Sequence, residues 1–175
     1  MLARIVDGLE EGVISLLLVT MTLLVFIEVV LRYGFGIGFM WVQELTLHMS
    51  AWLVLFGASY GVKVGSHIGV DAIVRLLSPG ARRIVTLAAI ALCLVYCAVF
   101  IDGAWTYLAK MVKIGIHLED IPIPKYAAHS ILLFGFVLLA IRFLQLGWAV
   151  FKGDADGFRL ADEAKEALDE VAISA

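Results

Sequence analysis

Long apolar runs separated by short polar segments dominate this chain. Four runs cover residues 12–31, 41–64, 84–107 and 126–150, and each is bounded by charge, glycine or proline. A helix that crosses a bilayer needs about 20 largely apolar residues. The pattern therefore predicts an all-α integral membrane protein, with four transmembrane helices in a membrane domain over residues 1–153.

Two further segments are too polar to cross a membrane. In residues 66–78 the apolar side chains fall on one side of a helix and Asp71 and Arg75 on the other, which predicts a short helix lying in the interface between the second and third spans. Residues 154–175 are rich in acidic side chains and predict a cytoplasmic tail.

The distribution of Lys and Arg predicts the orientation, because basic residues near span ends stay on the cytoplasmic side. With the N-terminus inside, the inner segments hold nine of them: Arg4, Lys63, Arg75, Arg82, Arg83, Arg142, Lys152, Arg159 and Lys165. The outer segments hold four: Arg32, Lys110, Lys113 and Lys125. We therefore expect both the N- and C-termini to be cytoplasmic.

Composition narrows the classes of function. The chain is 62% hydrophobic and has a formal net charge of -3, with a mean hydropathy of +0.99. These values argue against a large soluble domain and against a basic surface for nucleic acid. No Ser/His/Asp, Cys/His or metal-ligand pattern is recognisable in the sequence. We expect no enzyme activity and no cofactor or metal bound by this chain.

Charged residues near the outer ends of the spans are the first candidates for function, because ionisable groups in a membrane are costly. Glu28 and Arg32 are four residues apart, and Glu44 begins the second span at a similar level, so Arg32 is expected to bridge the two carboxylates. Asp102 of the third span is a further candidate for this layer. Two interpretations fit: a structural charge cluster, or a site for an ion, a proton or a partner's polar groups.

The second span presents two faces. Trp41, Glu44, His48 and Trp52 follow one another at helical spacing and form a candidate contact with another protein or a structural polar cluster. On a nearly opposite side, small residues recur every four positions, which allows close helix packing in lipid; they are Gly57, Gly61 and Gly65.

A second pair of titratable residues follows this span. His67 and Asp71 are four residues apart at the start of the predicted interfacial helix. Two roles fit this spacing: a hydrogen bond that fixes the turn, or a response to cytoplasmic pH.

These residues together resemble a known family. The run Arg32-Tyr33, Trp41, Glu44, Trp52, Gly57-Ala58 and Gly65-x-His67-Ile68-x-Val70-Asp71 is similar to the signature of the DctQ-like small membrane subunit of tripartite ATP-independent periplasmic (TRAP) transporters. The chain departs from it at Gln43, where the family often has a second acid.

The resemblance implies a scaffold subunit in the bacterial inner membrane. Its partners would be a large permease subunit, which alone would bind sodium, and a periplasmic substrate-binding protein. The implied function is sodium-driven uptake of an organic acid, such as a C4-dicarboxylate or sialic acid. The alternatives are a self-sufficient small transporter or channel lined by Glu28, Glu44 and Asp102, and a regulatory anchor acting through the acidic tail.

Overall fold

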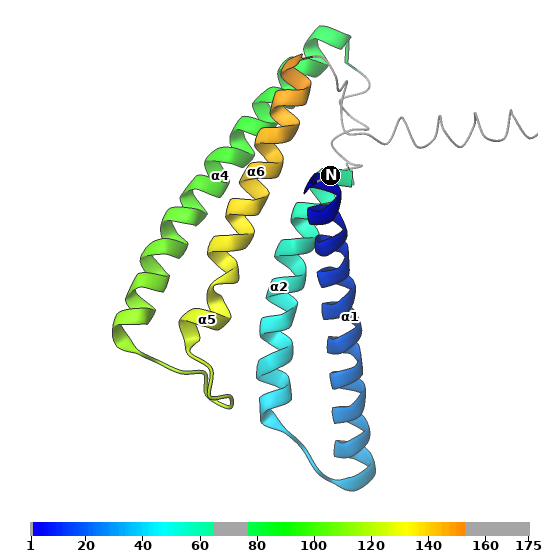
Figure 1. The fold of residues 1–175 in the computed structure, drawn as a ribbon, viewed down its shortest axis with the longest axis vertical. Helices are drawn as coiled ribbons and strands as arrows, with labels where there is room; N and C mark the ends of the chain where they lie inside the picture. Colours follow the sequence, from blue (N-terminus) through cyan, green and yellow to red (C-terminus); the bar gives the residue numbers. More distant parts are fainter. Residues whose placement is uncertain (1, 65–76, 153–175) are drawn as a thin grey trace, which may run out of the picture. The chain divides into compact units, whose positions relative to one another are not determined.

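A computed structural model describes residues 2–64 and 77–152 of the chain, and these residues are almost entirely helical (Figure 1). Among them the only extended pairing is an isolated bridge between His117 and Pro124. The helices are α1 (Leu2–Phe35), α2 (Met40–Val64), α4 (Pro79–Ile114), α5 (Lys125–His129) and α6 (Ile131–Lys152).

Four helical stretches are long and apolar enough to cross a membrane, which confirms the predicted number of spans. They are Glu10–Phe35, Met40–Val64, Gly80–Ile114 and Lys125–Lys152. The predicted interfacial helix falls almost wholly outside the described residues, and its last two positions, Leu77 and Ser78, are not helical. The tail over residues 154–175 also lies outside them.

Local chemistry sets where the long helices end. Gly36 and Gly115 adopt positive φ angles of 71° and 70° immediately after α1 and after Ile114 of α4. Side chains with a Cβ disfavour this conformation, so glycine is the usual residue at such a helix end. At the other end of α4, Pro79 occupies the first helical position, where its missing N–H costs no hydrogen bond.

The fourth span is broken near its N-terminal end, although no Gly or Pro pair in the sequence predicts a break. Ser130 separates α5 from α6, and both its backbone N–H and its Oγ donate to the Ala127 carbonyl oxygen, at 3.3 and 2.7 Å. A serine hydroxyl that bonds a nearby carbonyl competes with the regular helical pattern. The helix therefore restarts at Ile131.

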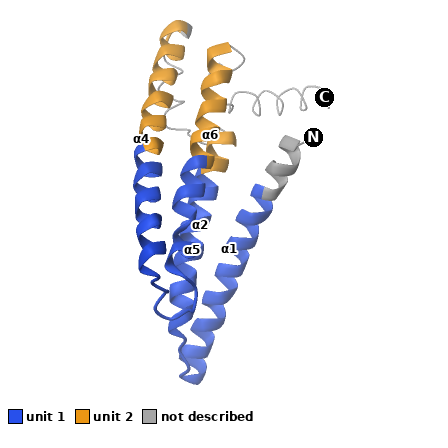
Figure 2. Cartoon of the chain, turned by 60° about the vertical axis from the view of Figure 1, so that its left-hand side comes forward, with its two compact units in different colours: residues 1–58, 99–137 blue, residues 59–98, 138–175 orange. Residues whose placement is uncertain are grey.

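The chain divides into two compact units, coloured separately in Figure 2. The first comprises residues 1–58 and 99–137, and the second residues 59–98 and 138–175. Helices α2, α4 and α6 contribute to both units. The first unit contains Glu28, Arg32, Glu44, His48 and Trp52, which we call the polar layer, so it positions the candidate site.

Each unit has its own packed interior. In the first, α6 lies close to α2, because a Cβ added at Gly135 would come 2.8 Å from the Leu55 Cβ, and the Phe100 and Phe136 rings stack at 4.7 Å between centroids. In the second, α4 and α6 meet around buried apolar side chains, among them Ile90, Cys97, Phe143 and Val150.

Many large apolar side chains point outward on all four spans. Examples are Leu16 and Phe26 of α1, Leu92 of α4 and Phe134 of α6, all of them more than half exposed. In water an apolar surface of this extent would aggregate, whereas lipid tails are as apolar as these side chains. The surface therefore suits a bilayer or an apolar protein partner.

Candidate functional site

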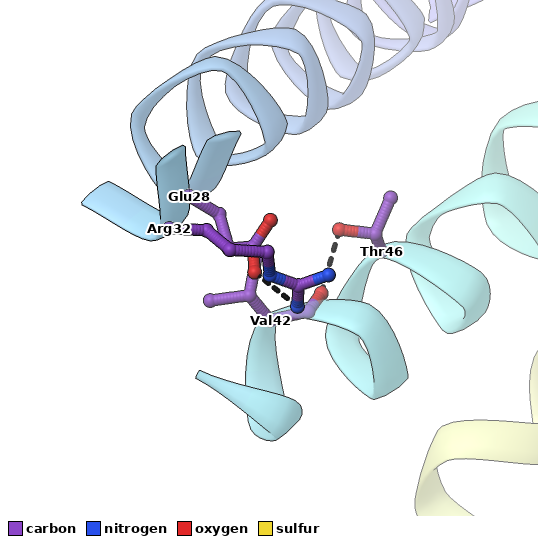
Figure 3. A network of polar contacts seen from close by, with 4 residues as sticks. All are labelled: Glu28, Arg32, Val42 and Thr46. Atoms are coloured by element: carbon purple, nitrogen blue, oxygen red, sulfur yellow. Dashed lines mark hydrogen bonds and ion pairs between the residues drawn. The ribbon is translucent and has the colours of Figure 1, made fainter. Parts of the chain in front are cut away.

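Glu28 and Arg32 form an ion pair on α1, as their spacing predicts (Figure 3). The Glu28 side chain is buried, whereas that of Arg32 is 40% exposed. The guanidinium packs over Gly38, where an added Cβ would lie 3.4 Å from the Arg32 Nε. In Figure 3 it points toward the first turns of α2, where the Thr46 hydroxyl donates to the Val42 carbonyl oxygen at 2.7 Å.

Glu44 binds the loop between α4 and α5 and does not bind Arg32. Its Oε1 accepts a hydrogen bond from the backbone N–H of Glu119 at 2.9 Å, and its Oε2 accepts one from the N–H of Asp120 at 2.8 Å. Hydrogen bonds to an ionised acceptor are stronger than neutral ones, and two of them define the orientation of the carboxylate. The expected bridge from Arg32 to Glu44 is absent from the described residues, and Glu44 fastens the loop tip to α2.

The loop that Glu44 holds is a narrow hairpin between α4 and α5. The N–H of Leu118 donates to the Ile123 carbonyl at 2.9 Å, and the N–H of Lys125 donates to the Ile116 carbonyl at 2.9 Å. The side chain of Leu118, within the hairpin, is buried. These contacts place the amides of residues 119 and 120 at its tip, so that both can reach one carboxylate.

Three side chains from different helices form a hydrogen-bonded chain. The Nδ1 of His48 lies 2.7 Å from the Glu44 carbonyl oxygen, and its Nε2 lies 3.2 Å from the Nε2 of His129. The Nδ1 of His129 in turn lies 2.7 Å from the Tyr107 hydroxyl. The imidazoles stack at 5.2 Å between centroids and an angle of 19°. This imidazole pair joins α2 to α5 and, through Tyr107, to α4.

Trp52 completes the polar connections of α2. Its Nε1–H donates to the carbonyl oxygen of Ala128 at 3.1 Å, immediately before the break in the fourth span. Trp52 and His48 also line a cavity of about 290 Å³, whose other walls are apolar residues of α1, α2, the hairpin and α5. The indole therefore satisfies a carbonyl near the break and closes one side of an apolar cavity.

The remaining predicted residues are not joined to these contacts. Trp41 is 41% exposed at the start of α2. Asp102 is exposed, and no hydrogen bond or ion pair links it to Glu28 or Arg32 within the part of the chain that the structure describes. Gly65, His67 and Asp71 lie outside the described residues.

Only Gly57 and Gly61 of the predicted glycine face of α2 lie among the described residues. A Cβ added at Gly57 would meet no atom of the described residues within 4 Å, so Gly57 does not mark a close helix contact inside the first unit. Gly61 lies one turn later, in the second unit. Close packing occurs instead at Gly135 of α6.

Sequence reasoning missed four participants: His129, Tyr107 and the backbone amides of Glu119 and Asp120. A signal existed for His129, because it is an ionisable residue near the start of an apolar span. Because 81 residues separate it from His48 in the sequence, no local spacing predicts the pairing. No sequence pattern predicts that a backbone amide will bind a distant carboxylate.

The fold and this internally bonded polar layer define a small, multi-pass membrane protein. The model of the family "Tripartite ATP-independent periplasmic transporters, DctQ component" matches residues 21–153. The chain belongs to this family, which confirms the resemblance found in the sequence.

Curated relatives agree with the family assignment. A C4-dicarboxylate TRAP transporter small permease protein DctQ from Vibrio cholerae is 32% identical, over 93% of this chain and 80% of the relative. A protein of the same name from Pseudomonas aeruginosa is 31% identical over 95% and 94%, and one from Rhodobacter capsulatus is 24% identical over 97% and 92%. All are named as transporter components and none as an enzyme, in agreement with the expectation that this chain is not an enzyme.

Proposed function

We propose that this chain is the small scaffold subunit of a sodium-driven TRAP transporter that takes up a C4-dicarboxylate across a bacterial inner membrane. Its partners are a large permease subunit and a periplasmic substrate-binding protein, and sodium binds only in the large subunit. The relatives' printed names favour a C4-dicarboxylate over sialic acid as the substrate.

One observation carries the scaffold role: the polar side chains of the outer layer are engaged in bonds within the chain. Glu28 pairs with Arg32, Glu44 accepts two loop amides, and the imidazole pair is bonded at both ends. A conducting path needs polar groups that bind an ion loosely enough to release it. Polar groups that already bond to another helix or to the hairpin are better suited to keep the subunit in one conformation when it contacts a partner.

The same observation weakens the alternative of a self-sufficient transporter lined by Glu28, Glu44 and Asp102. Glu28 and Glu44 have different internal partners, and Asp102 shares neither of them within residues 2–64 and 77–152. The acidic tail, on which the regulatory alternative depends, lies outside the described residues. Both alternatives predict outcomes that differ from those of the scaffold.

The partner surface is proposed on exposed apolar side chains and not on the internal polar layer. Trp41 is exposed at the start of α2, whereas the polar atoms of Glu44, His48 and Trp52 bond to groups within the subunit. The proposed topology has both termini in the cytoplasm, supported by the nine inner and four outer basic residues. It places the hairpin with residues 119 and 120 on the periplasmic side.

Gentle detergent extraction of the tagged chain, followed by mass spectrometry of co-purifying proteins, tests the proposal. We expect a large permease to co-purify, and sodium-dependent C4-dicarboxylate uptake to require both membrane subunits and the binding protein. Trp41→Ala should reduce co-purification, whereas Trp105→Ala, a matched change of an exposed tryptophan on α4, serves as the control. Ion or substrate flux through proteoliposomes that contain this chain alone would refute the scaffold role.

A further inference from the structure

We propose that His48 and His129 form one shared proton-binding site, which takes up a single proton where two separate imidazoles take up two. The site consists of the two facing Nε2 atoms, 3.2 Å apart, and of the fixed groups at the outer ends of the pair. This inference concerns the chain's own chemistry and does not depend on which partner or substrate the transporter uses.

The neutral pair has one arrangement of hydrogens that satisfies every contact. A carbonyl oxygen can only accept, so the His48 Nδ1, 2.7 Å from the Glu44 carbonyl, carries the hydrogen. The His48 Nε2 of the neutral ring is then an acceptor, and the His129 Nε2 must donate to it. That leaves the His129 Nδ1 as an acceptor for the Tyr107 hydroxyl.

One added proton can be accommodated without breaking the contacts. If His48 becomes an imidazolium, its Nε2–H donates to the His129 Nε2, and the hydrogen of His129 moves to Nδ1, where the Tyr107 oxygen accepts it. The tyrosine hydroxyl allows this exchange because it can donate or accept. The proton is thus shared by two rings that are already in hydrogen-bonding distance.

A second proton has no such arrangement. Both Nε2 atoms would then carry hydrogens that point at each other across 3.2 Å, and two positive rings would stack at 5.2 Å between centroids. Like charges at this separation repel strongly in a partly buried site. The second proton therefore separates His48 from His129 and breaks this connection between α2 and α5.

The surroundings include charges on several elements. Glu44 lies one turn before His48 on α2, Lys125 begins α5, and both act electrostatically on the pair. Tyr107 faces it from α4, and the hairpin carries the charged residues Glu119 and Asp120, whose backbone amides bind Glu44. From α1 the cavity beside His48 receives only the apolar Leu17.

The pair is better suited to a proton than to a metal ion. A zinc site takes three or four protein ligands, and within the described part of the chain no three His, Cys, Asp or Glu side chains are placed to hold a metal. Glu44, the nearest carboxylate on α2, directs both oxygens to the loop amides.

Nitrogen NMR of the full chain, labelled with ¹⁵N-histidine and reconstituted in lipid nanodiscs, tests this inference. The chain contains four histidines, and H67Q and H117Q variants assign the two outside the pair. We expect His48 as the Nδ1–H tautomer, His129 as the Nε2–H tautomer, and a scalar coupling between their Nε2 atoms. The exposed His117 is the internal control, because no other imidazole is paired with its ring among the described residues.

Acidification distinguishes a shared site from two independent ones. Over the pH range in which free imidazole, added as the reference, becomes fully protonated, the pair should take up half as many protons as two separate imidazoles, with both rings shifting in a single step. Independent shifts of the two rings that parallel the reference, or the absence of an Nε2–Nε2 coupling near neutral pH, would overturn the proposal.

The Tyr107→Phe variant separates a proton site from a purely structural stack. It keeps the ring that stacks on His129 at 5.6 Å but removes the hydroxyl oxygen that accepts the Nδ1–H of His129 in the singly protonated pair. We expect the neutral tautomers, which the Glu44 carbonyl fixes, to be unchanged, and uptake of the single proton to move to lower pH. Unchanged proton uptake in a folded Tyr107→Phe protein would contradict the role of the hydroxyl. If this variant does not fold, the spectra of the unmodified chain still decide the proposal.

Discussion

The contact between α6 and α2 at Gly135 leads to a quantitative prediction about the stability of the first unit. Gly135→Ala adds one methyl group, and its carbon would lie 2.8, 3.3 and 3.1 Å from the Cβ, Cγ and Cδ1 of Leu55. Ordinary van der Waals contacts begin at 3.4 Å. The helices must therefore move apart by about 0.6 Å, because the Leu55 Cβ is fixed to the backbone and no change of rotamer relieves its contact.

The size of the effect follows from two opposing contributions. Adding a methyl group to a packed interior costs about 1–3 kcal/mol. Replacing glycine by alanine inside a helix contributes about 0.5–1 kcal/mol in favour of folding. The second contribution also applies to Gly57→Ala on α2, where the new Cβ meets no described atom within 4 Å. The two variants should therefore differ by about 1–3 kcal/mol, which is the packing cost alone.

Reversible unfolding of the purified chain in mixed detergent micelles, followed by circular dichroism, measures this difference. We expect Gly57→Ala to be slightly more stable than the unmodified chain and Gly135→Ala to be less stable. Gly147→Ala of the second unit should fall between them, because its nearest contact, the Ile90 Cγ2, is at 3.4 Å.

A second substitution at Leu55 examines the cause. Leu55→Ala in the Gly135→Ala background removes the contacts to Cγ and Cδ1 but keeps the closest contact, to Cβ, so it should restore only part of the loss. Equal stabilities of Gly135→Ala and Gly57→Ala would refute the reasoning, because the close approach of α2 and α6 would then have no energetic consequence.

Three further predictions concern the polar layer. Trp52→Phe should destabilise the chain by about 1 kcal/mol in the same unfolding assay, because the carbonyl of Ala128 loses its donor; no loss would mean that water or another group replaces the indole. Arg32→Gln should lower the free energy of unfolding by about 1–3 kcal/mol, because it leaves the buried Glu28 unpaired. The loss is smaller than for a fully buried pair because Arg32 is 40% exposed. Adding Glu28→Gln should recover much of the lost stability. Glu44→Gln retains one acceptor oxygen for two amides, so hydrogen exchange at the hairpin tip should accelerate, whereas Gln43→Glu, a matched change at an exposed neighbour, should leave exchange unchanged.

Local periodicity was sufficient to predict the contacts that repeat along one helix. The spans follow from the lengths of the apolar runs, and the Glu28–Arg32 pair follows from a spacing of four residues. Both depend only on the rise and turn of an α-helix, which the sequence samples directly.

The contacts between helices could not be predicted in this way. Glu44 was expected to meet Arg32, because both lie near the outer membrane boundary, but the hairpin offers two amides at its tip, and these bind the carboxylate. The close approach of the helices at Gly135 could not be predicted either, since nothing in the sequence distinguishes Gly135 from Gly57. Such contacts depend on which faces of the helices meet, and a single sequence contains only weak information about that.

The polar connections of α2 also have a consequence for the order of assembly. Glu44, His48 and Trp52 bind partners that lie 75, 81 and 76 residues later in the chain. Because the chain is synthesised from its N-terminus, α2 is made before the hairpin and α5, and these three side chains lack their native partners until then. A chain that ends before residue 119 cannot form these bonds. The interactions that fix α2 therefore become complete only when residues 119 to 129 have been made.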